Sequence, residues 1–120
     1  WDAYRPYSVT VDMYDLFGEL SPQIPGTLKG ARNNRGSSVD ITIVRNDNIP
    51  LEMPSEAIVL DESLASRKPS TMSEEAYENL KYMSSIMGQA GFYASQTEWW
   101  HFDDADWAYY PVMDSNLFDF

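Results

Sequence analysis

The chain contains no cysteine, and a single histidine, His101, occurs among its 120 residues. Without cysteine there is no disulfide framework and no thiolate metal site, so a metal ion would need His, Asp, Glu or backbone oxygens as ligands. Basic residues are scarce too: 8 Lys and Arg stand against 19 Asp and Glu, which gives a net charge of -11. This charge repels phosphate backbones and anionic lipids, so we expect neither nucleic acid nor a membrane as a partner.

Long hydrophobic runs are also lacking. No apolar run approaches the roughly 18 residues that a membrane-spanning helix needs, and the first residues do not have the layout of a signal peptide. Hydrophobic residues nevertheless make up 43% of the chain and aromatic residues 14%, a composition typical of a globular domain and not of a disordered chain. With no internal repeat and no linker, we expect one domain over residues 1–120.

Two segments have the periodicity of amphipathic helices. Apolar residues at spacings of three and four predict a short helix that begins with Ser8 as its N-cap and ends near Gly18. A capping-box pattern at residues 71–74, with an apolar stripe behind it, predicts a longer helix that ends near Gly88 or Gly91.

Strand patterns are mixed with these helices. Alternating β-branched residues predict a strand over residues 37–44, with Asp40 on the face opposite its apolar side chains. The segment before Arg5 is expected to be extended, and segments rich in Pro, Gly and Asn are expected to be irregular, at residues 21–35 and 46–70. Aromatic segments predict further strands at residues 92–93, 97–102 and 107–110. Because no βαβ rhythm links these elements, the sequence indicates an α+β fold.

Residues able to carry chemistry are concentrated in two short segments, around Asp40 and over Glu98 to His101. Brought together, Asp40, Glu98 and His101 would supply two metal ligands and a general base, and Arg5 would stabilise an oxyanion. On a strand, positions three apart face opposite sides. Glu98 and His101 therefore serve one site only if a bulge, a turn or the end of the strand reorients one of them.

Each of these residues also has a purely structural interpretation. A histidine after two tryptophans is often a hydrogen-bonded core residue, and Asp40 would then be a solvated or turn-bonding carboxylate. Glu98 and Arg5 would be ordinary surface charges. For the acidic run Asp103–Asp106, a solvated turn is favoured over a cation site.

Taken together, several blocks resemble the D-alanyl-D-alanine dipeptidase family. These are zinc peptidases of the VanX type, in the M15 group of D,D-peptidases related to the Hedgehog fold. The matching blocks run in family order from one end of the chain to the other: Trp1–Pro6, Arg35–Thr42, Gly91–Phe92, Glu98–Phe102 and Phe118–Phe120.

The resemblance implies a single α+β domain with a small, mainly antiparallel sheet and flanking helices. It implies zinc as the cofactor, with Asp40 and His101 as ligands, and a small D-amino-acid dipeptide as the substrate. Glu98 would be the general base and Arg5 would stabilise the oxyanion. The remaining residues implied at the substrate pocket, mainly by packing, are Trp99, Trp100 and Ser38.

The chain departs from the family pattern Ser-x-His-x-x-Gly-x-x-x-Asp at two positions. Asn33 stands where the pattern has its first zinc-binding His, and Ala31 stands where it has Ser. An amide oxygen is a much poorer zinc ligand than an imidazole nitrogen. Two functions follow: zinc-dependent hydrolysis of D-alanyl-D-alanine or a similar dipeptide in cell-wall metabolism, or binding of small peptides or cell-wall fragments without catalysis.

The resemblance also bears on the extent of the chain and on its cellular compartment. The chain would lack the family's usual N-terminal region. Relatives occur in the cytoplasm and in the periplasm, and we expect the cytoplasm. The sequence leaves the oligomeric state open.

Overall fold

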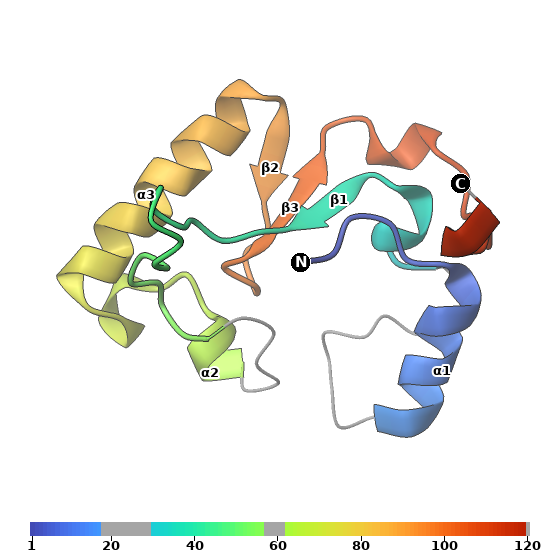
Figure 1. The fold of residues 1–120 in the computed structure, drawn as a ribbon, viewed down its shortest axis with the longest axis horizontal. Helices are drawn as coiled ribbons and strands as arrows, with labels where there is room; N and C mark the ends of the chain where they lie inside the picture. The colour runs from blue at the N-terminus through green and yellow to red at the C-terminus, as the bar shows by residue number, and fades with distance from the viewer. Residues whose placement is uncertain (18–29, 57–61, 120) are drawn as a thin grey trace.

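A three-stranded antiparallel sheet lies at the centre of the protein (Figure 1). The computed structural model describes residues 1–17, 30–56 and 62–119. The strands are β1 (Ser38–Asp40), β2 (Phe92–Ala94) and β3 (His101–Asp104), in the order β1-β3-β2. Strands mixed with helices on a small antiparallel sheet confirm the expected α+β fold.

The register between β1 and β3 brings the predicted site residues together. Asp40 is paired with His101, Ser38 with Asp103, and Val39 with Phe102. Directly opposite residues in an antiparallel pair point to the same face of the sheet. Asp40 and His101 therefore share one face, and Val39 and Phe102 share the other.

Helix α3 (Glu74–Gln89) covers the second of these faces (Figure 1). Its N-cap is Ser73, whose hydroxyl accepts a hydrogen bond of 3.0 Å from the backbone N–H of Ala76. The predicted capping box began two residues earlier, at Thr71, but that residue ends a short 3-10 helix, η3 (Pro69–Thr71). Gly91 follows the helix with a φ of 90°, a value that favours glycine.

The apolar core lies between α3 and the sheet. The α3 side chains buried there belong to the predicted apolar stripe, and aromatic residues of β3 and the preceding turn fill the rest of the space. The fully buried cluster consists of Ala65, Leu80, Met83, Trp99, Trp100 and Phe102. Val39, Ile41 and Ile43 pack against it, as their alternation predicted.

Helix α1 (Tyr7–Phe17) lies at the other end of the molecule from α3 (Figure 1). Ser8 is inside the helix and does not cap it; the Asp114 carboxylate accepts hydrogen bonds of 2.8 Å and 2.7 Å from the backbone N–H and hydroxyl of Ser8. The predicted apolar stripe is largely exposed, and Thr10 is the buried residue of this helix. Gly18, the predicted end of the helix, lies outside the described residues.

Three predicted strands differ from the structure: those at 37–44 and 97–102 are shorter than expected, and the one at 107–110 is not a strand. Strand β3 begins only at His101, because residues 98–100 form a turn, so β1 is shorter than the predicted 37–44. The segment at 107–110, predicted as a strand, follows a turn at residues 105–106, in which the backbone N–H of Asp106 donates to Oδ1 of Asp104 at 2.7 Å, and it forms a 3-10 helix, η4 (Trp107–Tyr109).

The segment predicted as irregular at 46–70 contains the short helix α2 (Glu62–Ala65), and the apolar run at 57–60 lies outside the described residues. Residues 30–35, the described part of the other predicted loop, contain the 3-10 helix η2 (Asn33–Arg35), which Gly36 ends at a φ of 62°. The last such helix is η5 (Leu117–Asp119). Within the described part of the chain, no helix is long and apolar enough to cross a membrane.

Candidate functional site

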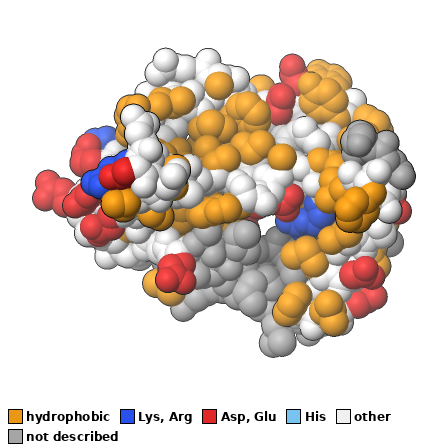
Figure 2. Space-filling model, viewed as in Figure 1, with side chains coloured by type: hydrophobic (Ala, Val, Ile, Leu, Met, Phe, Trp, Pro, Cys, Tyr) orange, Lys and Arg blue, Asp and Glu red, His pale blue; other side chains and the backbone are white. Residues whose placement is uncertain are grey.

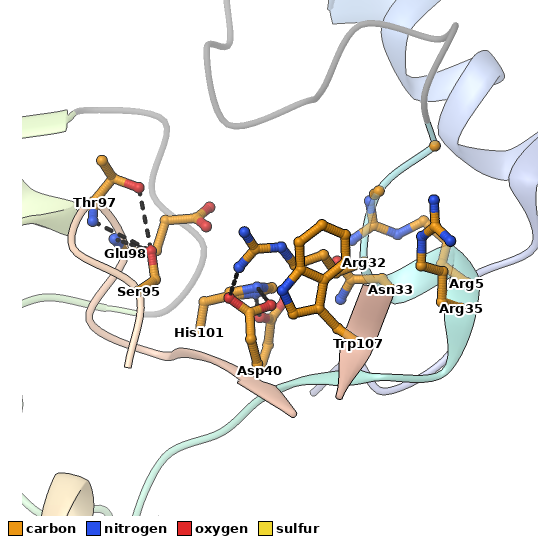
Figure 3. A pocket seen from close by; sticks show the side chains of 13 residues that line it. Arg5, Arg32, Asn33, Arg35, Asp40, Ser95, Thr97, Glu98, His101 and Trp107 are labelled. Carbon is orange, nitrogen blue, oxygen red and sulfur yellow. Dashed lines mark hydrogen bonds and ion pairs between the residues drawn. The ribbon is translucent and has the colours of Figure 1, made fainter. Parts of the chain in front are cut away.

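A pocket with a cavity volume of about 670 Å³ opens on the face of the sheet opposite α3. Figure 2 shows acidic and basic side chains side by side at a hollow in the molecular surface. The pocket contains all four residues that the sequence proposed for chemistry, and its polar lining is Arg5, Arg32, Asn33, Arg35, Asp40, Ser95, Thr97, Glu98, His101 and Asp103, with Trp107 beside them (Figure 3). The volume suits a small-molecule ligand.

His101 lies between two carboxylates in this pocket. Its Nδ1 is 2.7 Å from Oδ1 of Asp40, and its Nε2 is 3.0 Å from Oδ1 of Asp103. Asp40 reaches the ring across the sheet, and Asp103 reaches it along the same strand, since residues two apart share a face. Both ring nitrogens are therefore engaged.

These carboxylates change the titration of His101. Burial lowers its pKa, but the hydrogen bonds and negative charges of Asp103 and Asp40 outweigh burial and raise the pKa to about 9. His101 is therefore a cation at neutral pH. Its positive charge lies between two negative ones, where it balances part of the acidity of the pocket.

Asp103 is a site residue that the sequence analysis assigned to a solvated turn. The residue is 5% exposed, and besides His101 its side chain forms an ion pair with Arg32. Arg32 in turn lies 4.3 Å above the ring of Trp107. The two-residue period of β3 was the available signal, because it places Asp103 on the same face as His101.

Glu98 reaches the same pocket from the turn before β3. The backbone N–H of His101 donates to the carbonyl of Glu98 at 3.3 Å, which closes this turn. The reorientation that the sequence required of Glu98 is therefore provided by the start of the strand. The hydroxyl of Ser95 accepts from the backbone N–H groups of Thr97 and Glu98, at 3.2 Å and 3.3 Å, and holds the turn in place (Figure 3).

The Glu98 carboxylate has no hydrogen-bond or ion-pair partner among the described residues. Burial raises its pKa, and so do the negative charges of Asp40 and Asp103, against the opposing effects of His101 and Arg5. A half-buried carboxylate with a raised pKa and no partner is available to accept a proton or to bind a cation.

Arg67 holds the Glu98 turn from the core side and was not identified from the sequence. Its guanidinium donates to the carbonyls of Trp99 and Glu98, at 2.6 Å and 3.4 Å, and to the hydroxyl of Ser84 at 2.9 Å. It also lies 4.8 Å above the ring of Phe102. Burial lowers its pKa to about 10, so it remains charged at neutral pH.

Arg5 and Arg35 lie on the side of the pocket opposite Glu98 (Figure 3), whereas Arg32 is paired with Asp103 beside His101. Arg5 pairs with Asp2, with its Nε 2.9 Å from Oδ2 of that residue. Arg35 donates to the carbonyl of Tyr110 and has no acidic partner among the described residues. Arg35 and Glu98 are thus opposite charges without an ionic partner, on two sides of one cavity.

The residues expected to shape the substrate pocket lie elsewhere. Trp99 and Trp100 are 0% and 2% exposed and belong to the core cluster, and neither lines the pocket. Ser38 is also buried and outside the pocket lining, and its hydroxyl has no hydrogen-bond partner among the residues that the structure describes. The tryptophans support the site from behind, because they fix the turn between Glu98 and His101.

The side chains do not fit the zinc ion that the resemblance implies. The Asn33 amide occupies the position of the first ligand, and its buried Nδ2 has no hydrogen-bond partner in the described part of the chain. Asp40 and His101, the two ligands that the resemblance retains, lie 2.7 Å apart, and the amide at position 33 does not supply the imidazole nitrogen that a third ligand would need. Among the described residues, no group of three or more His, Cys, Asp or Glu side chains is arranged to hold a metal ion.

The fold and the pocket agree with a comparison of the sequence with known families. The chain matches the D-ala-D-ala dipeptidase family, peptidase M15, over residues 1–120 and belongs to this family. It is also similar to the D-alanyl-D-alanine dipeptidase of Escherichia coli (strain K12), with 26% identity over 113 residues, which are 94% of this chain. The chain spans 58% of the length of that relative. The resemblance inferred from the sequence blocks is confirmed.

Proposed function

We propose that this member of the dipeptidase family binds a small zwitterionic dipeptide, D-alanyl-D-alanine or a close analogue, without a metal ion. One observation carries the proposal: Glu98 and Arg35 are opposite charges on two sides of a cavity of about 670 Å³, and neither has an ionic partner within the part of the chain that the structure describes. A free dipeptide has an ammonium group at one end and a carboxylate at the other. The charge pattern of the pocket is complementary to both ends.

Glu98 would bind the ammonium group of the dipeptide. Its carboxylate is accessible from the pocket, and a cation that binds there favours the ionised form and compensates the burial that raises its pKa. The nearby Asp40 and Asp103 already interact with His101 or Arg32. Glu98 is therefore the available anion for this end of the ligand.

Arg35 would bind the carboxylate of the dipeptide. A guanidinium binds a carboxylate through two parallel hydrogen bonds, which fix its orientation as well as its charge. Arg5, already paired with Asp2, would add positive potential on the same side. The two ends of the ligand would then be distinguished by opposite sides of the pocket.

Titration calorimetry with the chelator-treated protein tests this function. D-alanyl-D-alanine should bind, and each of Glu98→Gln and Arg35→Gln should weaken binding about tenfold or more, since a hydrogen bond to a charged group contributes roughly 1.5–3 kcal/mol. The N-acetylated dipeptide should lose the contribution of Glu98, and the C-terminal amide should lose that of Arg35. Arg45→Gln, which removes a surface arginine paired with Asp47, is the matched control. Unchanged affinity in both pocket variants would rule out the assignment.

A second candidate function is hydrolysis of the same dipeptide, for which the resemblance implies a zinc ion although Asn33 replaces the first ligand. The raised pKa of Glu98 favours it, because a carboxylate in this state is suited to accept the proton of an attacking water. Arg5 would stabilise the oxyanion, and water would add across the broken peptide bond to give two amino acids. Release of D-alanine by the parent protein with added zinc, lost in Glu98→Ala, would establish hydrolysis. Release only after Asn33→His would show that position 33 limits it.

A further inference from the structure

The side-chain amide of Asn33 is buried but forms no hydrogen bond with the described residues around it. The residue is 6% exposed, its Nδ2 is buried, and no hydrogen bond joins either amide atom to another described residue. Its backbone, in contrast, is fixed, because the carbonyl of Asn33 accepts from the N–H groups of Arg5 and Gly36 at 3.0 Å and 3.2 Å. Leaving a buried amide unpaired costs free energy that a ligand could recover.

The neighbouring asparagine shows what a structural amide looks like here. Asn34 is 0% exposed, and its Oδ1 accepts from the backbone N–H of Ala31 at 2.6 Å. Its Nδ2 donates to Thr10 Oγ1 and to the carbonyl of Arg5, both at 2.8 Å. The amide of Asn34 thus joins η2 to α1 and to the segment before it. The amide of Asn33 joins nothing, although the two residues are adjacent and both buried.

The place of Asn33 connects this free amide with the pocket. Asn33 lines the cavity between His101 and Arg35, opposite Glu98 (Figure 3). The middle of a dipeptide held at its ends by Glu98 and Arg35 would pass this position. Because no hydrogen bond holds the amide, rotation about its χ2 angle can turn Nδ2 into the cavity.

We propose that Asn33 recognises the peptide group of the ligand, with its Nδ2 donating a hydrogen bond to the peptide carbonyl oxygen. This inference rests on the proposed function, because it needs the dipeptide to lie between Glu98 and Arg35. It gives the substituted position a binding role of its own, distinct from metal ligation. A peptide-bonded ligand would then be preferred over a zwitterion of similar length without a carbonyl at its centre.

A double-mutant cycle between protein and ligand tests the hydrogen bond, with all binding measured in chelator. Asn33→Leu should weaken D-alanyl-D-alanine binding about tenfold, the upper range for one hydrogen bond. The thioamide analogue, whose sulfur is a poorer acceptor than oxygen, should bind the parent several-fold more weakly than the amide. The two ligands should bind Asn33→Leu equally, because the donor is gone.

Further variants keep the test decisive. Asn33→Asp has nearly the same shape without the donor and should also lose affinity, so it replaces Asn33→Leu if circular dichroism shows that variant to be misfolded. A ketomethylene analogue keeps the carbonyl and lacks only the peptide N–H, and its affinity should depend on Asn33 as that of the dipeptide does. Asn46→Leu, at an exposed position, is the control and should leave all affinities unchanged.

The outcomes separate this inference from the proposed function. If Glu98→Gln and Arg35→Gln weaken binding while Asn33→Leu does not, the dipeptide binds but Asn33 does not contact it, and this inference is wrong. Equal losses for the thioamide in parent and Asn33→Leu would overturn it as well. If the dipeptide does not bind the parent protein, the proposed function fails and the role of Asn33 fails with it.

Discussion

Alternating residues of the short strand β3 form its two faces, of which one packs in the apolar core and the other lines the pocket. Phe102, together with Trp100 just before the strand, is turned towards α3 and is 0% exposed in an apolar cluster. His101 and Asp103 are turned the other way and line a pocket of charged side chains. One face is stabilised by removing apolar surface from water, and the other by charges that neutralise one another.

Because of this difference, substitutions that affect stability and substitutions that affect ligand binding should fall on different faces of β3. The core face has its packing partners within the chain, so changes there should lower the free energy of unfolding. On the pocket face, the side chains of Glu98 and Asn33 have no hydrogen-bond or ionic partner among the described residues, and Arg35 has no acidic partner among them, so changes there should alter binding more than folding. Removal of a group from the core face should therefore change mainly stability, and removal of a group from the pocket face should change mainly ligand affinity.

The largest effect is expected from Phe102→Ala on the core face. Truncation of a buried phenylalanine removes apolar burial and leaves a cavity, which typically lowers the free energy of unfolding by about 3–5 kcal/mol. Urea denaturation followed by tryptophan fluorescence measures the change. Tyr93→Ala on β2, where the side chain is 68% exposed, is the matched control and should change stability far less. Similar losses in both variants would contradict the assignment of the core face.

Arg67→Met tests the link between the two faces. The substitution keeps the length of the apolar stem but removes the donors to the carbonyls of Glu98 and Trp99, and we expect a loss of about 2–3 kcal/mol. Because the Glu98 turn is then less well fixed, dipeptide affinity should fall as well. Arg45→Met at the surface should change neither quantity. Full stability together with full affinity in Arg67→Met would show that the turn does not need this anchor.

The pocket face is examined directly through the ring of His101. As the single histidine of the chain, it gives unambiguous NMR signals, and we expect it to titrate near 9. Asp103→Asn should lower this pKa, because it removes one of the two carboxylates that hold the proton. A pKa that stays unchanged in Asp103→Asn would contradict the arrangement around the ring.

The same pKa predicts how stability depends on pH. Because the pKa of His101 is raised on folding, its contribution is fully present below its ordinary value of 6.5 and is lost as the pH rises through about 9. The loss of stability over this range, measured by urea denaturation at a series of pH values, should therefore be smaller in Asp103→Asn than in the parent.

The smallest effect is expected where α1 begins. Asp114→Asn weakens the hydrogen bonds to Ser8, and because these bonds are exposed the change in melting temperature should be slight. Those bonds lower the pKa of Asp114, so their contribution is present above its ordinary value of 3.8 and is lost as the pH falls through the lowered one. Faster hydrogen exchange of the Ser8 amide, with unchanged dipeptide affinity, is the expected result. A large loss of affinity would mean that this helix end belongs to the pocket.

Local sequence patterns predicted the elements whose buried face follows from their own periodicity. The apolar period of α3 and the alternation around Asp40 are local properties, and both gave the correct buried face. The need for a turn between Glu98 and His101 followed from strand geometry alone. These rules gave the condition under which Glu98 and His101 share a site, and the family resemblance implied that Asp40 joins them.

The rest depended on which partners the folded chain supplies. The 107–110 segment has strand-like residues but follows a turn closed by the hydrogen bond from the Asp106 N–H to Asp104 Oδ1, and the stripe on α1 is amphipathic but stays largely exposed. Asp103 was assigned to solvent because its partner, Arg32, is distant in sequence. The roles of Trp99 and Trp100 depend on α3 packing against them, which no local pattern reveals.

The most direct test of the central claim is calorimetry of D-alanyl-D-alanine binding to one protein sample, first in chelator and then with a slight excess of zinc. A pocket whose charges pair with the ends of the dipeptide, and in which Asn33 stands at the position of the first zinc ligand, should bind the ligand in chelator and gain little from zinc. No binding in chelator, followed by tight binding once zinc is added, would contradict the account and restore the metal to the centre of the site.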